Sequence, residues 1–169
     1  IEEAPSDLRD LYPGRFGYLY RCPKPVLAQI NGPCAGLVLA LYADLRFAAE
    51  DAKFAKASAA RGLVAEHGIA WLLPRLVGEP RALDLLFSAR KFTGAEADRM
   101  GLVNKALPAG SLSAHASEVA RMFAPDASPR SVAAMKRQVR ASYFQSFTDS
   151  LATADAEIKR SFSAPDFKE

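Results

Sequence analysis

Two short segments of this chain combine residue types that could support chemistry. In the first, the small-residue segment NGPCAG at positions 31–36 separates one apolar run from a second apolar run that begins at Leu37. A helix beginning at Leu37 would have backbone N–H groups without partners inside the helix, and these could donate to an oxyanion or a phosphate. The alternative is an ordinary strand-turn-helix unit in which Gly36 only permits close packing.

A carboxylate and an imidazole follow one another in the second segment, GLVAEHG at positions 62–68. Glu66 could move protons as a general acid or base, and His67 could hydrogen-bond this carboxylate or line a pocket. The alternative for Glu66 is a surface carboxylate near the start of a helix at Ile69, where a negative charge is favourable. The residues alone leave both roles open.

Short apolar runs that alternate with helical patterns predict the elements that hold these segments. Strands are expected at residues 26–30, 45–49 and 102–107, with a short strand or turn at 53–55. Helices are expected at residues 37–43, 69–76, 79–89, 94–100, 111–123, 129–143 and 148–162. Thr93 is the expected N-cap of the helix at 94–100, with Glu96 completing a capping box. No G-x-G-x-x-G motif follows a strand, which argues against a dinucleotide-binding fold.

Composition excludes several classes of partner. The chain has 169 residues, of which 50% are hydrophobic, and this is enough to bury a core. Its 22 Lys and Arg against 19 Asp and Glu are too small an excess for a nucleic-acid partner. Cys22 and Cys34 follow no metal-binding spacing and lie far from His67 and His115, so no metal site is expected. We expect a cytoplasmic protein without a membrane partner, because the sequence shows no signal peptide or long apolar span.

Six short motifs in a fixed order carry a family resemblance. They are KPVLAQING at 24–32, DLRFA at 44–48, AEDAKF at 49–54, GL at 62–63, LPRLVG at 73–78 and ADRMGLVN at 97–104. With these spacings the chain closely resembles the enoyl-CoA hydratase/isomerase family, the crotonase superfamily, over most of its length. The resemblance implies an α/β fold. Residues 1–110 would form part of a spiral of β-β-α units without the family's N-terminal strands, and residues 111–169 a C-terminal helical region that builds homotrimers or hexamers.

The same resemblance implies an acyl-CoA thioester substrate that reacts through an enolate, with no cofactor besides the CoA of the substrate. Two N–H donors must then meet the thioester oxygen. One falls on the backbone N–H of Leu37, directly after Gly36. The other belongs to a family segment that would precede residue 1, so we expect this sequence to be a fragment of a longer protein. The candidate substrate-binding residues are Gly36, His67, Trp71 and Lys24.

The carboxylate positions of the family are altered in this chain. The stretch before Asp44 is shorter than the family pattern, and the first hydratase glutamate meets only LAL at 39–41. The second falls on Ser58, whose hydroxyl cannot replace a carboxylate as an acid or base near neutral pH. Glu66 matches the acid/base position of family isomerases. We therefore predict an enoyl-CoA hydratase/isomerase-family enzyme with Glu66 as its acid/base; the alternative is a non-catalytic protein that binds acyl-CoA or only oligomerises.

Overall fold

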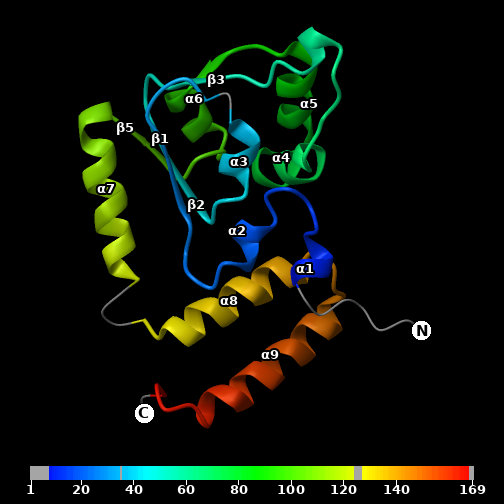
Figure 1. Ribbon diagram of the computed structural model, residues 1–169, viewed down its shortest axis with the longest axis vertical. Coiled ribbons are helices and arrows are strands. Elements are labelled where there is room, and N and C mark those ends of the chain that lie inside the picture. The colour runs from blue at the N-terminus through cyan, green and yellow to red at the C-terminus, as the bar shows by residue number, and fades with distance from the viewer. Residues whose placement is uncertain (1–7, 35, 124–126, 168–169) are drawn as a thin grey trace. The chain divides into compact units, whose positions relative to one another are not determined.

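The chain folds into helices and short strands, shown as a computed structural model in Figure 1. The structure describes residues 8–34, 36–123 and 127–167. Among the described residues, no helix is long and apolar enough to cross a membrane. Within the same ranges, no three His, Cys, Asp or Glu side chains are grouped so that they could hold a metal ion.

Packing contacts divide the chain into two compact units. One comprises residues 26–120, and the other combines residues 1–25 with residues 121–169. In the second of these units, the N-terminal helices pack against a helix near the C-terminus. The predicted domain division at residue 110 stays a prediction. The role of residues 111–169 in oligomerisation stays a prediction.

The unit of residues 26–120 is built on a parallel sheet. Its strands are β1 (Leu27–Ile30), β2 (Leu45–Ala49) and β5 (Lys105–Leu107), in the spatial order β1-β2-β5 (Figure 1). In the register of the sheet, Leu27 lies opposite Leu45 and Phe47 lies opposite Lys105. The central strand β2 is buried along its length after Leu45, as expected for a parallel strand covered on both faces.

The remaining elements of this unit surround the sheet. They are α3 (Leu37–Leu41), β3 (Lys53–Phe54), the 3-10 helix Ala59–Arg61, α4 (Ile69–Val77), α5 (Glu79–Ser88), β4 (Phe92–Thr93), α6 (Gly94–Arg99) and α7 (Ala109–Met122). The last two residues of α7 are grouped with the other unit. The helix α3 lies beside α4, and β3 pairs antiparallel with β4 (Figure 1).

A buried arginine explains two of the sequence motifs. The Arg46 Nε donates to the carbonyl of Leu102 and its Nη1 donates to the carbonyl of Ala43, each at 2.8 Å. The backbone N–H of Arg46 donates to Asn104 Oδ1 at 2.8 Å. Because a buried charge is costly unless it is hydrogen-bonded, these contacts give Arg46 a structural role that joins β2 to the segment before β5.

The predicted strand at residues 102–107 begins three residues late, at Lys105. Leu102 and Val103 are buried instead in the turn after α6, where both N–H groups donate to the carbonyl of Ala97. The predicted helix at residues 37–43 is also shorter and ends at Leu41. Apolar residues predict burial equally well in a strand, in a helix and in the turn that adjoins it. Their pattern therefore does not reveal at which residue the strand begins or the helix ends.

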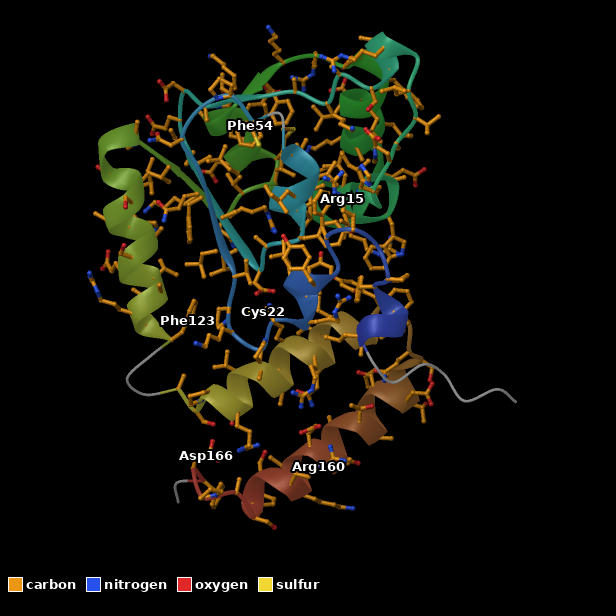
Figure 2. All side chains as sticks on the ribbon, in the orientation of Figure 1. Arg15, Cys22, Phe54, Phe123, Arg160 and Asp166 are labelled. Carbon is orange, nitrogen blue, oxygen red and sulfur yellow. The ribbon has the colours of Figure 1, made fainter. Side chains whose placement is uncertain are left out.

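The turn before α3 is tied to β3. The N–H of Cys34 donates to the carbonyl of Lys53 at 2.8 Å, and Cys34 forms a parallel bridge with Phe54. Phe54, labelled in Figure 2, is fully buried and stacks on Phe92 with ring centroids 5.1 Å apart. The start of α3 is therefore held by a buried aromatic pair.

The N-terminus of α6 packs directly on the sheet. A Cβ on Gly94 would lie 1.9 Å from the carbonyl oxygen of Ala49, so only glycine fits. Thr93 is the N-cap of α6, as predicted. Its Oγ1 accepts from the N–H of Glu96 at 3.2 Å. The Glu96 carboxylate lies 2.7 Å from Nη2 of Arg90, so only the Thr93 half of the predicted capping box is seen.

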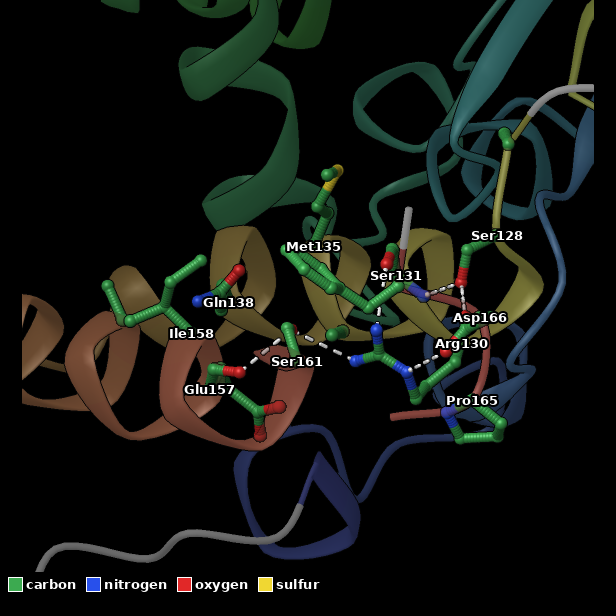
Figure 3. Close-up of a pocket in the computed structure, with 14 residues that line it drawn as sticks. Ser128, Arg130, Ser131, Met135, Gln138, Glu157, Ile158, Ser161, Pro165 and Asp166 are labelled. Carbon is green, nitrogen blue, oxygen red and sulfur yellow. Dashed lines mark hydrogen bonds and ion pairs between the residues drawn. The ribbon is translucent and has the colours of Figure 1, made fainter. Parts of the chain in front are cut away.

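The other unit contains four helices within its described residues, α1 (Leu8–Leu11), α2 (Tyr18–Arg21), α8 (Pro129–Ser142) and α9 (Phe147–Phe162). Tyr12, directly after α1, joins α2 to α8 and the segment after it. Its ring packs edge-on against Tyr20 and Phe144, and its hydroxyl donates to the carbonyl of Arg140 at 3.0 Å. A groove of about 690 Å³ lies between α8 and α9 (Figure 3).

Candidate active site

The first part of the candidate site is the start of α3. Leu37 is the first residue of this helix and is almost fully buried, so its N–H has no acceptor within the helix itself. Gly36 precedes it as the N-cap and is exposed. A Cβ on Gly36 would meet no atom within 4 Å. The space beside this glycine is therefore open to a molecule that approaches the turn.

A half-buried thiol lies in the same turn. Burial raises the pKa of Cys34, and a hydrogen bond with the backbone of Gly36 only partly opposes this effect. The thiol is therefore neutral at physiological pH, and it leaves no negative charge to compete with an anion at the turn.

Glu66 is the centre of the second part of the site. Its carboxylate lies 2.9 Å from the ammonium of Lys56 and 3.7 Å from Nε2 of His67. The hydrogen bond and the charge of Lys56 lower the pKa of Glu66, with a smaller contribution from His67. The Glu66 side chain is 44% exposed, whereas that of Lys56 is only 14% exposed. The carboxylate is thus ionised at neutral pH and open to solvent on one side.

Ser58, which the family resemblance places at the second hydratase glutamate, has backbone contacts that shape a loop in this structure. It is buried and precedes the 3-10 helix. Its carbonyl accepts from the N–H of Arg61 at 3.0 Å and from the N–H of Leu63 at 2.8 Å. Ser58 therefore shapes the first half of the loop that leads to Glu66.

Trp71 and Lys24 were the other predicted substrate contacts. Trp71 is half-buried on α4, where the guanidinium of Arg75 lies 3.8 Å from its ring centroid. Arg75 also donates to the Trp71 carbonyl at 2.8 Å. Lys24 is exposed and belongs to the other compact unit, where its carbonyl accepts from Lys136. The structure groups Glu66 with His67 and Gly36 with Leu37. The role of Lys24 in binding the substrate stays a prediction.

Sequence reasoning did not find the two side chains that hold the Glu66 loop. Lys56 reaches Glu66 from ten residues away, and the hydroxyl of Tyr42 donates to the carbonyl of His67 from twenty-five residues away. Neither contact follows a helix or strand period. The only signal in the sequence is the presence of a long basic side chain and a phenol near otherwise apolar segments.

Comparison with known proteins decides the family. Residues 8–169 match the family model described as enoyl-CoA hydratase/isomerase. The chain belongs to the enoyl-CoA hydratase/isomerase family. The family predicted from the motifs is therefore confirmed.

Individual members of the enoyl-CoA hydratase/isomerase family show how much of the chain is shared. A probable enoyl-CoA hydratase of Rhodobacter capsulatus is 44% identical over 103 residues, which are 60% of this chain and 40% of that protein. A peroxisomal Delta(3,5)-Delta(2,4)-dienoyl-CoA isomerase of Arabidopsis thaliana is 40% identical over 87 residues, 50% of this chain and 31% of the isomerase. The chain thus spans less than half the length of these curated relatives.

A solved structure confirms the predicted α/β fold class. The crystal structure of an enoyl-CoA hydratase/isomerase from Cupriavidus metallidurans CH34 superposes with a TM-score of 0.82 at 32% identity. The superposition covers 88% of this chain and 57% of the other. The small parallel sheet and the helices around it are therefore the crotonase-like fold that the motifs predicted.

Proposed function

We propose that this chain is part of an enzyme that shifts the double bond of an enoyl-CoA thioester, with Glu66 as the only carboxylate that moves protons. The observation that carries this proposal is the pairing of Glu66 with Lys56, which holds an ionised base at the isomerase position. Both hydratase glutamate positions lack a carboxylate, since they hold residues 39–41, LAL, and Ser58. A 1,3-proton shift needs only one group, because the proton taken from one carbon is returned to another.

The reaction begins when Glu66 removes a proton from the carbon next to the double bond. The electron pair moves through the conjugated system to the thioester oxygen, and the N–H of Leu37 donates to this oxygen. A second N–H donor to the same oxygen would complete the stabilisation of the enolate. Protonated Glu66 then returns the proton to the far end of the allylic system, so the product differs from the substrate only in the place of its double bond. No cofactor takes part besides the CoA of the substrate.

Lys56 changes its role during this cycle. Its ammonium is bound to Glu66 while the carboxylate is charged, and the attraction weakens when Glu66 takes up the proton. Glu66 is thus a weaker base than a carboxylate without a cationic partner. Loss of the pairing on protonation gives Glu66 a strong tendency to return the proton, which favours the second half of the shift.

The second candidate function is acyl-CoA binding without turnover. An exposed Lys–Glu pair is also an ordinary surface feature that contributes little to stability. The low pKa of Glu66 and the missing hydratase glutamates favour this alternative. In that case, acyl-CoA thioesters bind at the open turn beside Gly36 and leave unchanged.

The deciding experiment incubates the intact protein with 3-enoyl-CoA and follows formation of the conjugated 2-enoyl-CoA by absorbance. We expect turnover, and a loss of about 10²- to 10⁴-fold in kcat for Glu66→Gln with acyl-CoA binding retained. Glu118→Gln is the matched control, because Glu118 is exposed on α7. Turnover by the Glu66→Gln variant at the wild-type rate would exclude Glu66, and binding with no turnover by the wild-type protein would support the second candidate.

Besides the acyl-CoA, we propose that the chain binds further copies of itself. The helix α9 has no fully buried residue, and four apolar side chains follow its axis at helical spacing: Phe147, Leu151, Ile158 and Phe162. Met135 of α8 and Ile158 line the groove between the two helices (Figure 3). A second copy of the chain would cover this face in a homotrimer or hexamer.

A further inference from the structure

A buried tyrosine links the two parts of the candidate site. Tyr42 is the C-cap residue of α3, and the residue as a whole is 7% exposed. Its hydroxyl donates to the carbonyl of His67 at 3.1 Å. A buried phenol needs such a partner, and here the partner is the backbone directly after Glu66.

The backbone that Tyr42 contacts has an uncommon conformation. His67 has φ of 55° and Gly68 has φ of 79°, so two consecutive residues lie in the left-handed region. This region is uncommon for residues with a side chain, although histidine adopts it more readily than most. The same phenol packs against Gly68, because a Cβ on that glycine would lie 2.9 Å from the Tyr42 hydroxyl oxygen.

The helix α3 connects this contact to the turn. It comprises five residues, with Leu37 at its first position and Tyr42 directly after its last. With a rise of about 1.5 Å per residue, a helix of this length keeps its two ends close together. One of its ends presents the Leu37 N–H, and the other holds the loop that carries Glu66.

We propose that Tyr42 is a positioning residue, which fixes the loop of Glu66 to α3 and thereby fixes the base relative to the N–H of Leu37. Lys56 contacts the carboxylate itself, whereas Tyr42 contacts the backbone of the next residue, His67. The catalytic part of this inference rests on the proposed double-bond shift. The structural part, that Tyr42 orders the loop, is measured separately.

Tyr42→Phe is the direct test in the intact protein, because it removes one hydroxyl and keeps the ring in the core. We expect kcat to fall about 10- to 100-fold with little change in KM, since a base displaced by about an ångström loses rate rather than affinity. Tyr18→Phe is the control, because Tyr18 is an exposed tyrosine in the other compact unit. A Tyr42→Phe variant with the kcat of an active wild-type protein would overturn the positioning role.

Loop order is measured without reference to turnover by amide hydrogen exchange at Ile69, whose N–H donates to the Glu66 carbonyl at 3.2 Å. We expect faster exchange in Tyr42→Phe and unchanged exchange in Tyr18→Phe. If the wild-type protein has no turnover, the proposed function fails, and faster exchange still shows that Tyr42 orders the loop. Equal exchange in the Tyr42→Phe and wild-type proteins would contradict the inference in either case.

A second variant guards against a general loss of packing. Gly68→Ala strains the left-handed backbone in any background, but only with Tyr42 present does its Cβ also meet the phenolic oxygen. We expect Gly68→Ala to lower the midpoint of thermal unfolding more in the wild-type background than in Tyr42→Phe. Equal shifts of the unfolding midpoint in the two backgrounds would show that the Tyr42 hydroxyl is not in close contact with residue 68.

Discussion

The carboxylate of Glu66 lies 2.9 Å from the ammonium of Lys56, which reaches it from the segment after β3. The strand β3 also accepts the N–H of Cys34, in the turn that leads to Leu37. The base and the turn are therefore tied to one strand by Lys56 and Cys34. The Tyr42 contact makes a second connection from the far end of α3. These two connections join the Glu66 loop to the turn and to the helix that carry the Leu37 N–H.

Removal of Lys56 changes the pH at which Glu66 works. Glu66 acts as a base only when it is ionised, so activity falls as the pH drops through its pKa. Lys56 lowers that pKa, and Lys56→Met returns it upward. We expect the acid limb of the plot of kcat/KM against pH to move to higher pH in Lys56→Met. Lys53→Met, which changes an exposed lysine of β3, serves as the control and keeps the wild-type limb; no difference between the two variants would mean that Lys56 does not set the pKa.

We predict that Asp166 makes a pH-dependent contribution to stability in the unit that contains α8 and α9. Its carboxylate accepts from Ser128 and lies 3.0 Å from Nε of Arg130, and these contacts lower its pKa (Figure 3). A lowered pKa in the folded state stabilises the protein above the unfolded value of about 3.9, and this stabilisation is lost as the pH falls through the folded value. Asp166→Asn should therefore unfold at a lower temperature than wild type at pH 7.

The pH series separates this effect from a general loss of packing. The difference in unfolding temperature between Asp166→Asn and wild type should shrink once the pH is below the folded pKa of Asp166. Asp155→Asn changes an exposed carboxylate on α9 and should leave the unfolding temperature unchanged at both pH values. A difference that stays constant with pH would show that the charge of Asp166 is not its source.

Two glycines in helices should respond to alanine in opposite directions. Gly94→Ala places a Cβ against the carbonyl oxygen of Ala49 and should destabilise the protein by about 1–3 kcal/mol or more. Gly110→Ala meets no atom within 4 Å in α7 and should be neutral or stabilising by up to about 1 kcal/mol. Urea unfolding of both variants measures the two free energies. Equal stability of the Gly94→Ala and wild-type proteins would contradict the packing of α6 on the sheet.

The sequence allowed the fold to be predicted closely where local patterns decide it. The apolar strand at residues 45–49 and the helix start at Leu37 depend on neighbouring residues, and both are confirmed. The contacts of Glu66 with Lys56 and of Tyr42 with His67 depend on how separate segments pack, so no spacing reveals them. These packing contacts, which the motifs do not encode, lower the pKa of Glu66 and tie its loop to other segments.

The exposed apolar face of α9 gives the last prediction. Leu151 and Ile158 are 52% and 50% exposed and lie two helical turns apart on one face. If a second copy covers this face, Leu151→Glu with Ile158→Glu places two carboxylates in an apolar contact that cannot solvate them. We expect this double variant of the intact protein to sediment as a smaller species than wild type.

The matched control places the same two charges elsewhere on the same helix. Ala152 and Ala156 are exposed residues of α9 outside the apolar face, and Ala152→Glu with Ala156→Glu should keep the wild-type assembly. Circular dichroism of both double variants reports whether α9 still forms. An assembly that survives Leu151→Glu with Ile158→Glu would exclude this face as the contact between copies, because buried carboxylates without partners could not be accommodated at its centre.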